Sequence, residues 1–131
     1  MNPYLVLSQK DGRPMYLQIT DQIKSLIAQG DWQPGEKVPS IRELAVASKV
    51  SVITVKRAYQ DLERDGVLMT QAGVGSFVAE NTNLGDQIMK QEIDKHLSNA
   101  LTHAKTFGLS LEQLMMRLKK LASENNGEKN D

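Results

Sequence analysis

The sequence predicts an α+β protein in which three helices and a β-hairpin precede a pair of helices. Apolar residues recur every three or four positions in two regions, 16–62 and 93–122, which is the period of amphipathic helices. Between these regions, two short runs rich in β-branched or aromatic residues flank glycines, a pattern typical of a hairpin. A chain of 131 residues has the length of one domain with an appendage.

Composition excludes several classes of protein. The chain is 40% hydrophobic and 24% charged, as globular proteins are, and it contains no uncharged apolar segment that could span a membrane. It lacks cysteine, which excludes disulfides and thiolate metal sites. His96 and His103 have no further ligands nearby in the sequence, and two histidines supply no catalytic constellation. We therefore expect a cytoplasmic protein that is not an enzyme and binds no metal, cofactor or membrane.

The first helix is predicted from the stripe Tyr16, Ile19, Ile23, Leu26 and Ile27. Gly30 suits its C-terminus, and residues 33–36, "QPGE", suit a tight turn. Trp32 is expected to pack beside this helix. A second, short helix begins at Ser40, which forms a capping box with Glu43, and ends near residues 48–49.

The stretch "KVSVITVK", residues 49–56, is rich in β-branched residues and could be a strand. As a strand, this stretch would have polar and apolar side chains mixed on both faces. A helix instead gives an apolar stripe of Val55, Ala58, Tyr59 and Leu62. We therefore predict a third helix, with Ser51 as its N-cap and residues 65–66 as its end. Val52 and Ile53 then lie in its first turn, off the buried stripe, where Ile53 faces either solvent or the core beneath the hairpin.

The hairpin is predicted to pair residues 67–70 with 76–79 around a tip at 72–75. The G-x-G at this tip is no dinucleotide loop, because a strand follows it and Val78 stands where the third glycine would be.

Residues 80–85 look like a linker, and two further helical stripes follow it, with a capping box at Ser110 and Gln113. Together these stripes present more apolar positions than a helical hairpin can bury against itself, so we expect a homodimer. We predict a DNA-binding domain at 1–80, a dimerisation hairpin at 81–125 and a disordered tail at 126–131. The expected dimerisation residues are Ile93, Leu97, Leu101, Leu111, Leu114, Met115 and Leu118.

The formal net charge is zero, but the charge is unevenly distributed. Between Lys37 and Arg57 there are five basic residues and one acidic residue, a local net charge of +4. The predicted elements are a helix, a short capped helix, a third helix and a hairpin. This is the order found in a winged helix-turn-helix, whose third helix enters the DNA major groove. The alternative is a small α+β domain whose hairpin only closes the core.

Residues 13–78 resemble the DNA-binding domain of GntR-family transcription regulators. The matches are "PMYLQI" at 14–19, "VPSIRELA" at 38–45, "VS-TV-RAY" at 50–59, "LERDG" at 62–66 and "GVGSFV" at 73–78. The opening and the two-helix C-terminal part resemble the YtrA subfamily. This resemblance implies a homodimeric regulator, a repressor by analogy, that binds a palindromic double-stranded DNA operator.

The resemblance also implies roles for single residues. Arg42 would contact a phosphate or a guanine edge, and Ser40 and Ser51 would cap helices and offer amides or hydroxyls to phosphates. Thr54, Lys56 and Arg57 would lie on or beside the groove-facing side of the third helix, and Gly73 and Gly75 would shape the wing. The sequence departs from the family at Val52, where arginine is common, and at Ile53, which is usually polar. We count both among the expected DNA-contacting residues.

Two rival interpretations remain open. One is a non-specific architectural DNA-binding protein, which would give a diffuse footprint rather than a sharp palindromic one. The other is the N-terminal half of a regulator fused to a pyridoxal-phosphate aminotransferase-like domain, against which the self-contained helical hairpin argues. The residues identify no small-molecule effector.

Overall fold

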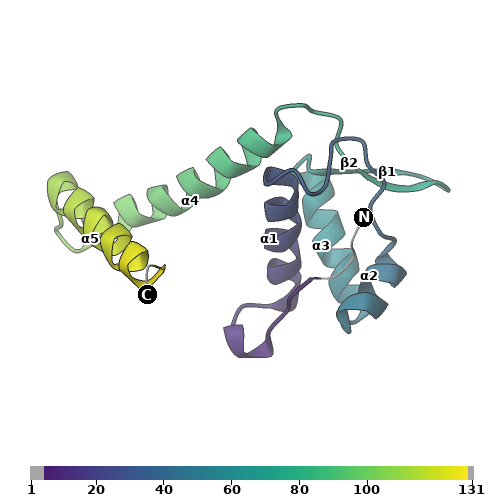
Figure 1. Ribbon diagram of the computed structural model, residues 1–131, viewed down its shortest axis with the longest axis horizontal. Coiled ribbons are helices and arrows are strands. Elements are labelled where there is room, and N and C mark those ends of the chain that lie inside the picture. Colours follow the sequence, from purple (N-terminus) through teal and green to yellow (C-terminus); the bar gives the residue numbers. More distant parts are fainter. Residues whose placement is uncertain (1–4, 130–131) are drawn as a thin grey trace. The chain divides into compact units, whose positions relative to one another are not determined.

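The computed structural model describes residues 5–129 of the chain. The fold divides into two compact units, one up to Met89 and one from Lys90 onward (Figure 1). The first unit contains a short 3-10 turn, η1 (Gln9–Asp11), followed by helices α1 (Met15–Ala28), α2 (Ile41–Ser48) and α3 (Val52–Arg64). Strands β1 (Leu68–Gln71) and β2 (Gly75–Val78) follow, and α4 (Leu84–Thr106) begins in this unit. This order confirms the predicted winged helix-turn-helix.

The core of the first unit lies where α1 and α2 pack on α3 and where the hairpin closes over them. The predicted stripes supply it, and Trp32 is buried at the end of α1, as expected. The fully buried side chains are led by Trp32, Tyr59, Ile19, Ile23, Leu44, Leu62, Val55 and Val78. Each buried aliphatic residue of this size stabilises the fold by about 1.5–3 kcal/mol, so the three helices depend on one another.

The hairpin is antiparallel, and its register pairs Leu68 with Val78 and Gln71 with Gly75. A third, very short segment adds to β2, because Lys37 bridges Phe77 and the amide of Val38 donates to the carbonyl of Ser76 at 2.9 Å. The sequence predicted the hairpin to within one residue but not this third segment, since three residues have no periodicity of their own.

The start of α4 differs from the predicted linker at 80–85. Leu84 and Ile88 are buried in the core of the first unit, so α4 begins inside the residues expected to be irregular. Gly85 packs close to α1, since a Cβ there would lie 3.4 Å from the Cα of Ala28 at the end of that helix. The predicted linker was therefore wrong for its last two residues, which form the start of α4.

A second unpredicted contact holds the segment before α1 in place. The amide side chain of Gln22 pairs with both backbone groups of Val6, and that of Gln18 pairs with both backbone groups of Ser8. Each glutamine side chain thus makes the pair of hydrogen bonds that the backbone of an adjacent strand would otherwise make. Gln18 is 2% exposed, and both N–H donors of its buried amide are used because it also donates to the carbonyl of Arg13.

The second unit consists of the rest of α4 and of α5 (Leu111–Lys129). Gly108, with φ of 74°, ends the turn after α4, and Ser110 and Gln113 form the predicted capping interactions at 3.2 and 2.9 Å. Helix α5 continues to Lys129, so it includes most of the residues 126–131 for which we expected a disordered tail. The end of α5 is polar and carries no apolar stripe, so the periodicity of apolar residues did not reveal it as helical. The last two residues lie outside the described part.

Candidate nucleic-acid interface

The turn between α2 and α3 is set by two helix caps and one strained residue. Helix α2 ends at Lys49, whose φ of 58° reverses the chain direction, and Ser51 caps α3 two residues later. The Ser51 hydroxyl accepts the Thr54 amide at 3.2 Å and shares a 2.8 Å hydrogen bond with the Thr54 hydroxyl. These interactions place the first turn of α3 on the surface, as the sequence predicted.

The exposed face of α3 carries both apolar and cationic side chains. Val52 is 47% exposed and Ile53 80% exposed, so Ile53 does not pack beneath the hairpin. Lys56 and Arg57 are exposed, Thr54 is half-buried, and Val55 between them is fully buried. The stripe that anchors the helix therefore leaves these residues on its outer side.

The N-terminus of α2 is held against α3 by Tyr59. The buried Tyr59 hydroxyl donates to the carbonyl of Pro39 at 2.7 Å, directly before the N-cap Ser40. Burial, and secondarily the charge of Glu43, raises the pKa of Tyr59, so its hydroxyl keeps the proton that it donates. The capping box between Ser40 and Glu43 is present, and Ser40 and Arg42 are exposed on the first turn.

Arg57 is held by a residue that the sequence did not single out for function. Its guanidinium lies 3.6 Å from the centroid of the Tyr16 ring, at the start of α1. Stacking uses the flat face of the guanidinium and leaves its N–H edges free to bind an anion. Tyr16 belongs to "PMYLQI", one of the segments that resemble the GntR family. The periodic pattern predicted for it only a place in the apolar stripe of the first helix.

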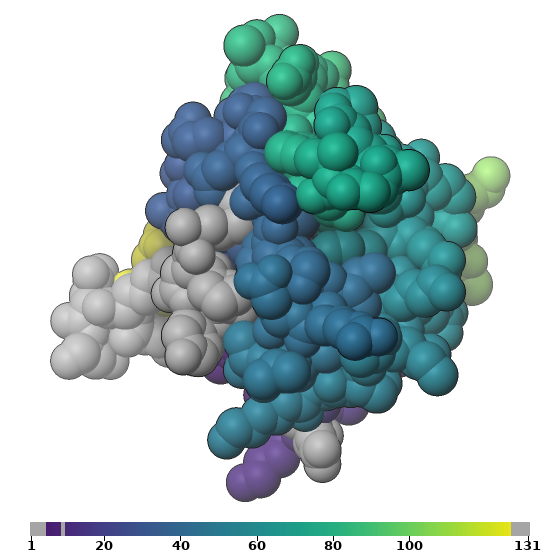
Figure 2. Space-filling view, turned by 90° about the vertical axis from the view of Figure 1, so that its right-hand side faces the viewer, coloured from purple at the N-terminus to yellow at the C-terminus, as the bar shows by residue number. Residues whose placement is uncertain are grey.

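The wing is the hairpin β1–β2 with its tip, residues 72–75. Gly73 and Gly75 have φ of 76° and 141°, which side-chain-bearing residues rarely adopt, so the tip requires glycine at both positions. Figure 2 shows α2 and α3, in blue to teal, on the same face as the wing, in green-teal. The two helices and the wing, which carry the expected DNA-contacting residues, therefore share one face of the first unit.

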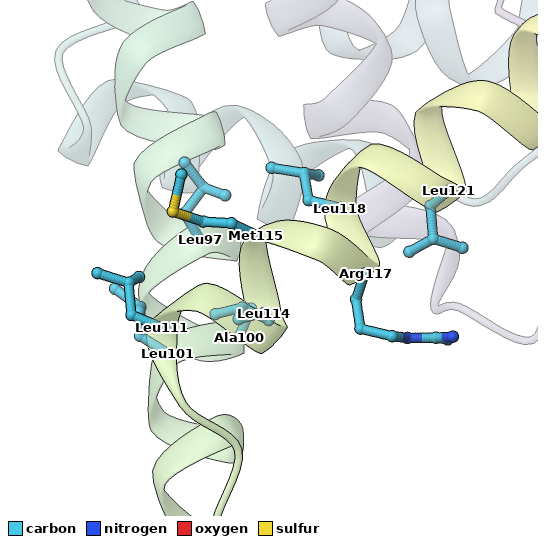
Figure 3. A pocket seen from close by; sticks show the side chains of 9 residues that line it. All are labelled: Leu97, Ala100, Leu101, Leu111, Leu114, Met115, Arg117, Leu118 and Leu121. Carbon is cyan, nitrogen blue, oxygen red and sulfur yellow. The ribbon is translucent and has the colours of Figure 1, made fainter.

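The second unit exposes an apolar groove between α4 and α5, with a cavity volume of about 320 Å³. Figure 3 shows the side chains that line it: Leu97, Ala100, Leu101, Leu111, Leu114, Met115, Arg117, Leu118 and Leu121. Arg117 is the one charged side chain among them. Of the expected dimerisation residues, Leu114 is half-buried and the rest are exposed, and Ile93 alone lies outside the groove lining.

Other kinds of site find no support in the described residues. Their histidines and carboxylates form no group of three that could hold a metal ion. None of their helices combines the length and the hydropathy that a membrane crossing needs.

Comparison with known proteins agrees with this geometry. The family model described as "Bacterial regulatory proteins, gntR family" matches residues 15–78, which run from α1 to the end of β2. The HTH-type transcriptional repressor YtrA of Bacillus subtilis (strain 168) is 35% identical over 128 residues, covering 95% of this chain and 98% of YtrA. The chain belongs to the GntR family. The likeness to YtrA over nearly the whole length confirms the expected subfamily.

Two solved structures extend the comparison of this GntR-family protein. A GntR family transcriptional regulator from Listeria monocytogenes is similar with a TM-score of 0.70 and 29% identity, covering 84% of this chain and 96% of that one. AraR(DBD), solved in complex with operator ORX1, is similar with a TM-score of 0.51 and 34% identity, covering 58% of this chain and 92% of that one. The first likeness includes residues of the C-terminal helices, because it extends beyond the length of the N-terminal unit.

Proposed function

We propose that this protein is a sequence-specific DNA-binding repressor that acts without catalysis, as a cytoplasmic homodimer, on a palindromic operator. The observation that carries the proposal is the face that α2, α3 and the wing share, with both helices capped by a serine. The relative named a repressor and the AraR(DBD) complex with an operator support the same assignment.

The residues of this surface divide into two roles. Arg42, Lys56 and Arg57 bind phosphates, and Ser40 and Ser51 orient the helix N-termini whose amides also favour anions. Val52, Ile53 and Thr54 lie on the first turn of α3, the part of a recognition helix that meets base edges in the major groove. Gly73 and Gly75 let the wing backbone approach the neighbouring DNA strand closely.

A second copy of the chain is the occupant that we propose for the groove between α4 and α5. The groove is lined almost entirely by carbon, and a two-fold axis would bring its leucines against the same residues of the partner. A symmetric dimer presents two α3 helices, and these fit half-sites about one DNA turn, roughly 34 Å, apart. The palindromic operator follows from this symmetry.

Footprinting upstream of the protein's own gene, combined with sedimentation of the purified full chain, tests the proposal. We expect a sharply bounded, palindromic protected site and a dimer in solution. Diffuse protection of unrelated DNA would instead support an architectural protein. A chain that stays monomeric at the concentrations that protect the site would contradict the proposed dimer.

A further inference from the structure

The wing of this protein has no charge of its own. Residues 67–79 contain no Lys, Arg, Asp or Glu. A wing that lies beside the phosphates of a DNA groove normally benefits from a cation, because phosphate contacts supply much of the affinity. The structure brings such a cation to the wing from another part of the chain.

This cation is Lys37, in the short segment that adds to β2. Its backbone bridges Phe77, and the flanking hydrogen bonds from Val38 to Ser76 and from Val78 to Glu36 are both 2.9 Å long. Lys37 therefore occupies a position in the sheet, three residues before the N-cap of α2. It lies between the wing, to which it is paired, and the start of α2, and we propose that both of these elements contact DNA.

The Lys37 side chain crosses the wing directly over Gly75. A Cβ at Gly75 would lie 2.8 Å from the Lys37 Cε, 3.9 Å from its Cδ and 3.6 Å from its Nζ. A Cβ at Gly75 would therefore push the mobile end of the lysine side chain aside. Lys37 is exposed, and within the described residues its ammonium makes no ion pair. The backbone turn requires Gly75, and the absence of a side chain there leaves the space that the end of Lys37 occupies.

We propose that Lys37 is the phosphate-binding cation of the wing, and that its side chain reaches the tip through the space over the bare Cα of Gly75. This inference rests on the proposed operator binding and adds a DNA contact to it. One phosphate beside the wing in each half-site is then neutralised by Lys37.

The test measures operator affinity of the full chain against salt concentration. Lys37→Gln should weaken binding by about three- to tenfold per half-site at 0.15 M salt, and should lower the slope of log affinity against log salt by about one per half-site. Lys37→Arg keeps the charge and should restore both quantities. Lys10→Gln makes the same charge change in η1, away from the wing, and should leave the slope unchanged.

A second measurement locates the contact. Neutral methylphosphonates are placed one at a time along the operator. The substitution at the wing-facing phosphate should weaken binding of the parent but not of Lys37→Gln, because that contact is already lost. A Lys37→Gln variant with the parent's salt slope and methylphosphonate pattern would overturn the inference while leaving operator binding intact. A parent that protects no site would overturn the proposed function itself.

Discussion

Val52 and Ile53 give the first turn of α3 an apolar outer surface. Both are exposed, so neither contributes to the core, and a β-branched residue costs a few tenths of a kcal/mol in helix propensity. An apolar side chain in a major groove contacts the thymine methyl group, and it disfavours polar base edges that it would desolvate. We therefore expect these residues to select thymine rather than guanine in each half-site.

The first prediction tests Val52 with modified operators. Replacing the thymine that faces Val52 by deoxyuridine removes only its methyl group, and should weaken binding by about 0.5–1 kcal/mol per half-site. Val52→Arg should shift the preferred base at that step toward guanine. Affinity that is unchanged by deoxyuridine at every thymine of the half-site would rule out the contact.

The second prediction concerns the stack of Arg57 on Tyr16. Tyr16→Leu removes the aromatic face and frees the guanidinium, which should weaken operator binding by about 0.5–1 kcal/mol per half-site, whereas Tyr16→Phe should bind as the parent does. The loss should vanish in an Arg57→Ala background. An equal loss in that background would mean that Tyr16 acts on DNA binding without Arg57.

At the scale of elements, the caps of α2 and α3 serve two purposes at once. Each cap satisfies backbone amides of its helix, and each lies on the surface proposed to meet DNA. We therefore expect both stability and DNA binding to depend on Ser40 and Ser51, so that loss of either hydroxyl would change the two together. Aspartate separates them, because it caps a helix as well as serine does but carries a negative charge.

The third prediction uses this difference at Ser51. Ser51→Ala should lower the free energy of unfolding by about 1 kcal/mol, measured by denaturant titration. Ser51→Asp should keep the parent's stability but bind operator at least tenfold more weakly, because its carboxylate would face phosphates. Ser110→Asp is the matched exchange in the cap of α5 and should affect neither quantity. Normal binding by Ser51→Asp would place this cap away from the DNA.

At the scale of the molecule, the operator recognition that we propose joins two copies of the N-terminal unit. Binding two half-sites through one dimer makes the second contact intramolecular, which raises affinity without any new interaction. The groove between α4 and α5 is the surface that we propose to provide this link. Apart from the half-buried Leu114, its leucines are exposed in the single chain, so replacing the exposed ones should change association and not the folding of one chain.

The fourth prediction disrupts that groove. Leu101→Glu combined with Leu118→Glu places charges at groove residues that are 49% and 55% exposed, and should give a folded monomer by sedimentation. This variant should lose most of its operator affinity and keep weak, non-specific DNA binding. Met116→Glu is a matched control, because Met116 is 69% exposed on α5 but does not line the groove. A double variant that remains dimeric would refute the proposed interface.

Local sequence patterns determined much of this architecture in advance. Three kinds of local feature were predicted correctly: the apolar stripes on the first three helices, the helix caps at Ser40, Ser51 and Ser110, and the glycines of the hairpin tip. Each depends on residues no more than four positions apart. Helix starts depend on hydrogen bonds between a side chain and an amide three positions on, so nearby residues suffice to recognise them. The exposure of Val52 followed from the same reasoning.

Contacts between distant residues were decided only in the folded chain. Lys37 lies over Gly75, Arg57 stacks on Tyr16, and Leu84 enters the core of the first unit, although each partner lies dozens of positions away. A period of 3.6 or 2 residues reports which face of an element is apolar, but not which other element that face meets. Packing chooses among the possible neighbours by shape and volume, and that choice brought an uncharged wing and a distant lysine together.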